Sequence, residues 1–202
     1  AALSIGGEAM AYAEPDYQVL ATYDQVEVRR YAPYVVAETT VEGSFNQARQ
    51  QAFRRLFNFI SGYNGQREPI AMTVPVNQAP SKGEKIAMTV PVFSSPDTIE
   101  TADRWTMEFV MPPGASLEAL PLPKDAAVRM REVPERVVAV HRYSGSTGEQ
   151  RYRERAAFLE RSLAQMGIEQ RGSPVQAVYN GPFTIGPLRR NEVVVEVAYT
   201  EK

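Results

Sequence analysis

The sequence predicts an α+β fold in which a distorted antiparallel β-barrel or sheet is built from two pseudo-symmetric halves, with two flanking helices. Three observations indicate this fold: an internal repeat, an amphipathic helix in each half, and β-rich runs on both sides of each helix. Each half is expected to read strand, strand, helix, strand, strand. Because a helix that buries one face needs a sheet to cover, two such units are expected to share one sheet or barrel.

The repeat aligns residues 26–44 with residues 128–146 at an offset of 102 positions, without a gap and with seven identities. Each block contains two β-rich runs and ends in Gly-Ser. Serine is a good N-cap, so Ser44 and Ser146 are expected where the two helices begin. The repeat therefore predicts two strands and the start of a helix in each half.

Apolar residues at three- to four-residue spacing predict the helices themselves. The first is expected over residues 45–61, with the buried stripe Phe45, Ala48, Ala52, Leu56, Phe59 and Ile60. The second is expected to end at Gly167, with the stripe Tyr152, Ala156, Leu159, Leu163 and Met166.

The β-rich segments after each helix complete the two halves. Strands are expected at 70–76, 86–92, 105–110, 175–179 and 192–199. We predict a single domain over residues 17–202, divided into halves 17–111 and 125–202 and a packed connector 112–124 that retains three leucines.

Residues 1–16 are expected to be an N-terminal arm or the remnant of a signal peptide. Their small and apolar residues and two Ala-x-Ala patterns resemble a secretory cleavage site, which predicts an exported or periplasmic protein. Glu8 within the apolar stretch favours an ordinary arm and a cytoplasmic protein instead. No other segment approaches the ~18 consecutive apolar residues of a membrane span, so we expect a soluble chain.

Composition excludes several classes of function. The 22 basic and 24 acidic residues give a net charge of −2, which offers no electrostatic basis for binding nucleic acid. The absence of cysteine excludes disulfides, thiolate metal sites and thioether-linked haem, and a single histidine excludes a histidine-rich metal site. No positioned nucleophile and base can be named, so we expect a binding protein and not an enzyme.

The segment IAMTVPV occurs twice, at 70–76 and 86–92. One interpretation is an antiparallel hairpin with its prolines at strand ends or at an edge. The other is that Met72 and Met88 line an apolar pocket, because an unbranched thioether adapts to a flat ligand and is able to ligate iron.

The first helix carries more apolar surface than one buried face requires. Two phenylalanines lie roughly 80 to 120° to one side of the buried stripe, among polar and basic residues. This shoulder is either additional core or a platform for a flat macrocycle, whose faces the rings would cover while arginine pairs with a carboxylate. The candidate binding residues are Arg49, Gln50, Phe53, Arg54 and Phe57. The two phenylalanines are expected to be more exposed than Ala52 and Leu56.

His141 is the one histidine, and it shares a strand face with Val137, Ala139 and Tyr143. It is either a hydrogen-bonded or rim residue or an axial ligand of a haem iron, which makes it the candidate metal ligand. In the segment 179–197, Arg189 and Arg190 either hold a loop through hydrogen bonds or border an anionic ligand.

Five segments, taken in order, resemble the SOUL haem-binding family: EVRRYAPYVVAETTVEG, the paired IAMTVPV, WTMEFVMP, VAVHRYSG and YNGPFTIGPLRRNEVVVEV. The resemblance covers residues 17–199. It implies a distorted barrel of two similar halves and reversible binding of haem or a related tetrapyrrole, for transport, buffering or sensing, through apolar contacts from the first helix and neighbouring loops. Some members place a histidine where this chain has Arg30, so the haem would be held hydrophobically or by His141 or a methionine.

The same duplicated architecture also resembles effector-binding domains of the gyrase-inhibitor-like type, which hold amphipathic cations with a buried acidic residue. Glu108, between Met107 and Phe109, is the candidate for that role. A Soret shift with haemin would support the first interpretation, and quenching of Trp105 by a lipophilic cation would support the second.

Overall fold

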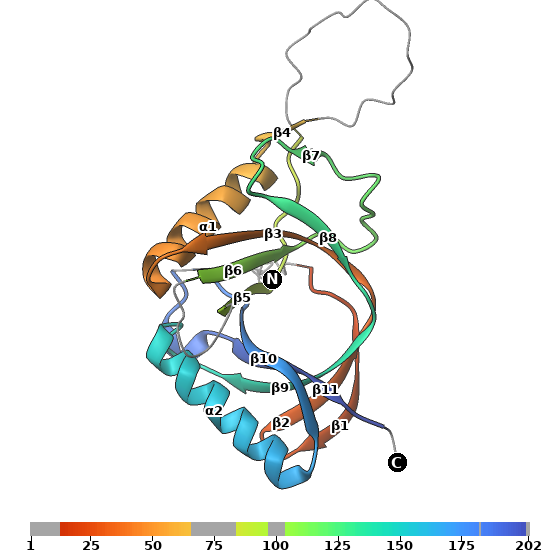
Figure 1. The fold of residues 1–202 in the computed structure, drawn as a ribbon, viewed down its shortest axis with the longest axis vertical. Helices are drawn as coiled ribbons and strands as arrows, with labels where there is room; N and C mark the ends of the chain where they lie inside the picture. Colours follow the sequence, from red (N-terminus) through yellow and green to blue (C-terminus); the bar gives the residue numbers. More distant parts are fainter. Residues whose placement is uncertain (1–12, 66–83, 97–103, 182, 201–202) are drawn as a thin grey trace, which may run out of the picture.

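The computed structural model of the chain describes residues 13–65, 84–96, 104–181 and 183–200 (Figure 1). It contains two helices, α1 (Phe45–Ile60) and α2 (Glu149–Met166), and a 3₁₀ turn at Gly186–Leu188 within these ranges. The strands are β1 (Tyr17–Tyr23), β2 (Val26–Tyr31), β3 (Tyr34–Glu42), β4 (Asn64–Gly65), β5 (Val92–Pro96), β6 (Arg104–Val110), β7 (Leu122–Pro123), β8 (Arg129–Val133), β9 (Arg136–Tyr143), β10 (Glu169–Val178) and β11 (Asn191–Ala198).

Nine of the described strands form one antiparallel sheet in the order β1-β2-β9-β11-β10-β5-β6-β3-β8, while β4 and β7 pair separately. The two halves exchange a strand, since β2 pairs with β9 and β8 pairs with β3. The halves meet again where β5 pairs with β10. The sheet curls into an open barrel, which confirms the predicted α+β class with a distorted sheet (Figure 1).

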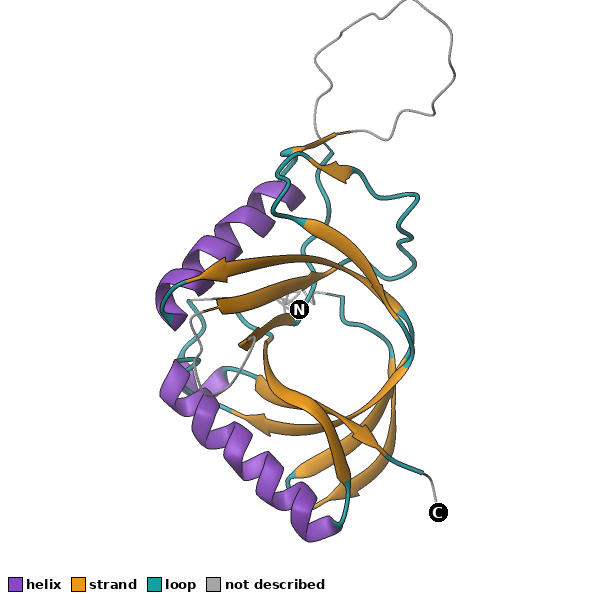
Figure 2. Ribbon diagram, viewed as in Figure 1, coloured by secondary structure: helices purple, strands orange, loops and turns teal. Residues whose placement is uncertain are grey.

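Both helices lie on the outer side of the curled sheet (Figure 2). Side chains alternate between the two faces of a strand, and on β3 the row Val35, Ala37, Thr39 and Val41 is buried on the face that packs against α1. The core beneath the helices includes Leu56 of α1 and Leu159 of α2. None of the helices in the described residues is both long and apolar enough to cross a membrane.

The helix predictions differ from the structure mainly at their ends. α1 buries the six residues predicted for its stripe, and α2 ends at Gly167 in the left-handed conformation with a φ of 67°. Ser44 is the N-cap residue of α1, as expected. Ser146 does not cap α2: its hydroxyl accepts a hydrogen bond from the backbone N–H of Gly148, and Gly148 is the N-cap residue.

The second IAMTVPV segment is not the predicted strand, because only Val92 belongs to β5. Its backbone bonds to other segments: the Ile86 N–H donates to the Ile60 carbonyl, and the Val90 N–H donates to the Ala13 carbonyl. The Thr89 hydroxyl donates to the Val110 carbonyl. These bonds replace the ladder of a hairpin. The first copy, with Met72, lies outside the described residues.

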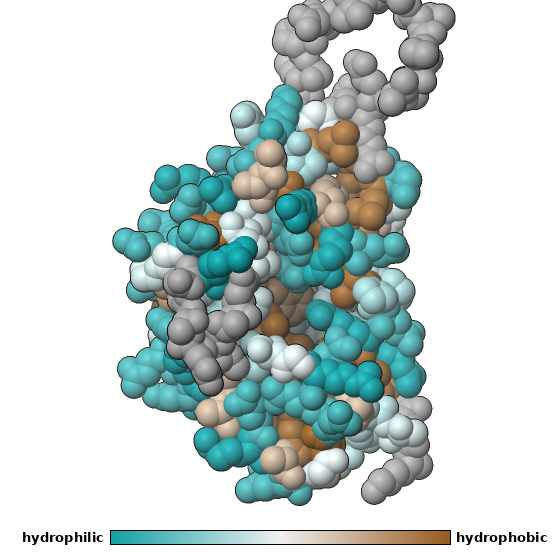
Figure 3. Space-filling model, viewed as in Figure 1, coloured by the Kyte–Doolittle hydropathy of each residue, from teal (hydrophilic) through white to brown (hydrophobic). Residues whose placement is uncertain are grey.

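The inner side of the sheet carries a second apolar cluster, which includes Val36, Phe93, Val138 and Val194. In Figure 3 the molecule is hollowed at its middle, and hydrophobic residues lie in the hollow.

Candidate functional site

The two phenylalanines of the shoulder lie on the surface of α1. Phe53 is 40% exposed and Phe57 is 43% exposed, whereas Ala52 and Leu56 are buried, as predicted. Their rings are stacked at a centroid distance of 6.0 Å and an interplanar angle of 13°. The edge of this pair is anchored to the core, because Phe53 meets the Phe109 ring at 5.4 Å. The shoulder is therefore an exposed pair of stacked aromatic rings with a fixed base.

Of the polar shoulder residues, Gln50 and Arg54 are exposed, and Arg49 is half-buried. Within the described ranges, no side chain or carbonyl bonds to Arg54, so its guanidinium faces solvent. Arg49 has a different role, because its Nη1 donates to both the carbonyl and the hydroxyl of Thr147 at 3.0 Å. Burial lowers the pKa of Arg49. Arg49 ties α1 to the turn before α2, and Arg54 remains the shoulder cation that is open to a ligand.

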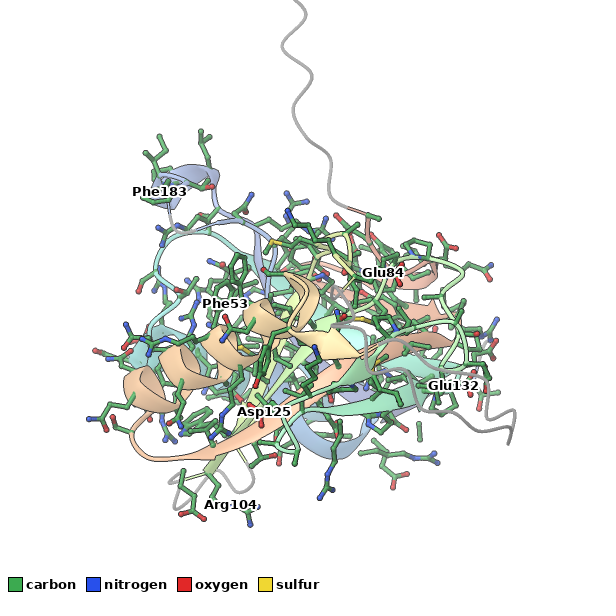
Figure 4. All side chains as sticks on the ribbon, turned by 90° about the horizontal axis from the view of Figure 1, so that it is seen from above. Phe53, Glu84, Arg104, Asp125, Glu132 and Phe183 are labelled. Carbon is green, nitrogen blue, oxygen red and sulfur yellow. The ribbon has the colours of Figure 1, made fainter. Side chains whose placement is uncertain are left out.

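A loop between β10 and β11 carries three exposed apolar side chains, Phe183, Ile185 and Leu188, and Phe183 is 98% exposed. The Gly145 N–H donates to the Gly186 carbonyl, which fixes this loop to the same turn that Arg49 contacts. Figure 4 shows Phe183 projecting away from the body of the molecule.

These three residues are not among those predicted from sequence. Their signal was present as apolar residues among the turn-forming residues of 180–188. A cluster of exposed apolar side chains marks a candidate binding surface. The loop is therefore a second apolar surface in addition to the shoulder.

The arginines that follow the loop are held by hydrogen bonds. Arg189 Nε donates to the Thr184 carbonyl at 2.7 Å. Arg190 is occupied by carboxylates, since its Nη1 lies 2.8 Å from Glu14 and its Nη2 lies 3.1 Å from Glu192. Arg190 therefore serves the structure of the open barrel, whereas Arg189 lies at the base of the apolar loop.

His141 lies in the core under α2, where its ring contacts Phe158 at a centroid distance of 4.4 Å. Its Nδ1 is 3.0 Å from the Gln25 carbonyl, and its Nε2 is buried without a partner among the described residues. Burial lowers the pKa of His141, which favours the neutral ring. A haem iron on the surface of α1 would not reach this nitrogen.

Met88 is half-buried and packs against the core beneath the helices. Neither Met88 nor His141 is exposed at the shoulder, so the described residues there offer a haem apolar contacts and a cation and not an axial ligand. The searched residues also contain no group of three His, Asp or Glu side chains arranged to hold a metal ion. The exposed aromatic pair suits contact with the apolar face of a tetrapyrrole, and exposed Arg54 suits pairing with its carboxylates.

Glu108, the candidate for binding a cation, is already paired. It accepts from Arg131 Nη2 at 2.6 Å, and Glu38 shares the same guanidinium at 3.0 Å. Burial raises the pKa of Glu108. Because Arg131 already compensates its charge, Glu108 is not available to bind a cationic ligand.

Comparisons with known proteins agree with this fold. A family model described as "SOUL heme-binding protein" matches residues 12–82 and 77–196, which is most of the chain. Among curated proteins, none matches the sequence.

Several solved structures are similar in fold. The C-terminal domain of EcmrR aligns over 91% of this chain and 99% of its own, at 11% identity and a TM-score of 0.58. EcmrR in its complex with DNA aligns over 87% of this chain and 58% of its own, at 10% identity and a TM-score of 0.61. A hydrolase from Listeria innocua aligns over 88% and 94%, at 10% identity and a TM-score of 0.52. At such identities the similarity shows the fold alone.

Proposed function

The chain belongs to the SOUL heme-binding protein family, and from this premise we propose that it reversibly binds haem or a related tetrapyrrole on the α1 shoulder. The observation that carries the proposal is the stacked and exposed pair of Phe53 and Phe57, with the solvent-facing Arg54 on the same helix. A porphyrin has two apolar faces and a carboxylate edge, which this combination of groups complements.

The apolar loop supplies a second set of contacts. Phe183, Ile185 and Leu188 leave large apolar surfaces in water, and a ligand that covers them gains the free energy of burying that area. Because the loop and Arg49 share the turn at residues 145–147, the loop and α1 hold a common anchor. We assign the loop to the ligand site together with the shoulder.

Binding of this kind needs no protein ligand to the iron. The stacked rings hold the macrocycle, and Arg54 pairs with a propionate at the solvent edge. A tetrapyrrole held by such surface contacts can dissociate and rebind. Reversible binding suits transport, buffering or sensing of the tetrapyrrole and not catalysis on it. When bound, the haem supplies a chromophore whose Soret absorption reports occupancy. Glu108 is already neutralised by Arg131, so we do not propose an amphipathic cation as the ligand.

A haemin titration followed by Soret absorbance tests the proposal. We expect a saturable Soret shift, and we expect Phe57→Ser to weaken it. Resonance Raman of the bound haem should be the same for the native protein and for His141→Gln, since His141 lies in the core. Absence of a saturable shift, or a shift that depends on His141 and not on Phe57, would contradict the proposed surface.

A further inference from the structure

The apolar loop between β10 and β11 holds its side chains in solvent on a hydrogen-bonded frame. Phe183, Ile185 and Leu188 are 98%, 64% and 71% exposed, and Phe183 projects away from the body of the molecule (Figure 4). The Leu188 N–H donates to the Ile185 carbonyl, and the Gly145 N–H donates to the Gly186 carbonyl, both at 3.0 Å. Because these bonds fix the loop, the exposure of its apolar tip is a property of the fold. Clustered apolar exposure of this kind marks an interaction surface.

The loop lies beside the flank of α1 that carries the shoulder. At about 100° per residue, Arg49, Phe53 and Phe57 follow one another around the helix at steps of about 40°. Arg49 contacts Thr147 in the turn that also holds the loop. Arg55 leaves the helix on the other flank, where it donates to β3 at 3.5 Å. The apolar loop and the two phenylalanines therefore belong to the same side of α1.

This side of the molecule is cationic. The helix α1 contains three arginines and no aspartate, glutamate or lysine, although the whole chain has a net charge of −2. Arg49 and Arg54 border the two phenylalanines, and Arg189 lies at the base of the loop. Burial and then the neighbouring charge of Arg189 lower the pKa of Arg49, which places two positive charges close together. Glu149, at the start of α2, is paired with Arg153 at 2.7 Å.

An apolar tip beside clustered arginines matches the surface of an anionic lipid bilayer. Proteins that lie on a membrane bury apolar side chains about 5 to 10 Å deep, at the boundary between headgroups and acyl chains, while basic residues meet the lipid phosphates. A bilayer deforms around a convex tip, whereas a protein partner must offer a complementary surface. We propose that the apolar loop inserts into the surface of an anionic bilayer, with Arg54 and Arg189 facing the lipid phosphates.

Membrane docking goes beyond the proposed haem binding and does not depend on it. The lipid covers the loop of the haem-free chain, so vesicle binding is expected without haemin. Because the loop also belongs to the proposed haem site, docking holds the haem surface of α1 next to the bilayer.

Sedimentation of the haem-free full chain with sucrose-loaded vesicles tests the inference. We expect binding to vesicles of equimolar phosphatidylglycerol and phosphatidylcholine, and much weaker binding to phosphatidylcholine alone. Replacing Phe183 and Ile185 together with serine should weaken binding by tenfold or more, because two apolar side chains no longer leave water. Replacing Val19 and Tyr23 with serine is the matched control: it removes exposed apolar side chains from the edge strand β1 and should leave binding unchanged.

Charge is tested on the same vesicles. Arg54→Gln should weaken binding by about fivefold, the effect of one basic residue at an anionic surface, and less in high salt. Arg129→Gln is the matched control, because it removes the same charge from an exposed position on the edge strand β8 and should leave binding unchanged.

Absence of binding to the anionic vesicles would overturn the inference, as would native binding by the folded loop variant or equal binding to phosphatidylcholine alone. Urea unfolding checks the fold of the loop variant, whose stability should be native since both replaced side chains lie in solvent. A chain that dimerises through the loop and does not bind vesicles would assign the loop to a second copy and contradict the inference. A Soret shift without vesicle binding refutes membrane docking alone, and vesicle binding without a Soret shift refutes the haem proposal alone.

Discussion

Replacing both Phe53 and Phe57 with serine is expected to weaken haemin binding by about thirtyfold. A phenylalanine presents about 200 Å² of surface, and exposed fractions of 40% and 43% leave about 165 Å² of the pair in water. A flat ligand covers one side of the stacked rings, or about 80 Å². At about 25 cal/mol per Å² this area is worth about 2 kcal/mol, which is a factor of about 30 in Kd.

The assay is the Soret titration, with two control variants measured beside the double serine variant. Tyr23→Ser removes a similarly exposed aromatic side chain from β1 and should leave the Kd unchanged. Leu56→Ala creates a cavity under the same helix and is expected to cost about 2 to 5 kcal/mol of stability, yet Leu56 has no exposed surface for a ligand to touch. At a temperature where it is folded, Leu56→Ala should bind haemin natively.

The stability of the variants distinguishes whether Phe53 and Phe57 form a binding surface or part of the core. Each serine replaces a side chain that is about two-fifths exposed, so each single replacement should cost less stability than Leu56→Ala. The reasoning is refuted if the folded double variant binds haemin with native affinity. It is also refuted if the double variant unfolds while Leu56→Ala loses haemin binding, since the shoulder would then be core.

Four further measurements test the haem surface and the stability of the core. Arg54→Glu should weaken haemin binding by repelling a propionate, more in low salt than in high salt, because exposed charges are screened within roughly 10 Å at 0.1 M; a salt-independent Kd would contradict this. Burial lowers the pKa of His141 below its ordinary 6.5, so the unfolded chain binds the proton first, and the free energy of unfolding should fall as the pH drops below 6.5 toward the folded pKa. Urea unfolding at pH 7 and pH 5 should show this loss in the native protein and a smaller one in His141→Gln; equal losses would exclude His141 as the cause. Glu192→Gln breaks a buried ion pair with Arg29, so it should cost about 3 to 5 kcal/mol in urea unfolding, and a cost below about 1 kcal/mol would show that the pair is dispensable. The haem-free chain should unfold cooperatively, since the core under both helices is complete without a ligand, and a broad non-cooperative transition would argue the opposite.

The helices could be predicted closely from sequence because their signal is local. A stripe with a period of 3.6 residues marks the face that meets a sheet, and the shoulder follows from the angle between residues on the same helix. Phe53 and Phe57 could therefore be placed outside the buried stripe from the amino-acid sequence alone. The strand β1 has no buried face, since it lies at the edge of the sheet with residues such as Val19 exposed, and it gave no comparable pattern.

The pairing of the strands could not be predicted, because it is a non-local property. The repeat at 102 positions reproduces the order of elements, but it does not state that β2 leaves its own half to pair with β9. That the two halves superpose as similar units remains a prediction, as do the boundaries 17–111 and 125–202. The second IAMTVPV segment shows the same limit: its β-rich composition is outweighed by hydrogen bonds to Ile60, Ala13 and Val110.

The site itself depends on which polar groups the fold uses internally. Arg49 and Arg54 are both basic residues of α1, and the sequence alone assigns them the same role. Five residues along a helix correspond to a rotation of roughly 140°, so the two guanidiniums leave the helix in different directions. Arg49 donates to the Thr147 carbonyl in the turn before α2 and is not available to a ligand, while Arg54 stays in water. Arg190 is likewise held by Glu14 and Glu192 and is not available to a ligand. Unpaired charge, and not charge as such, marks where this fold is ready for a ligand.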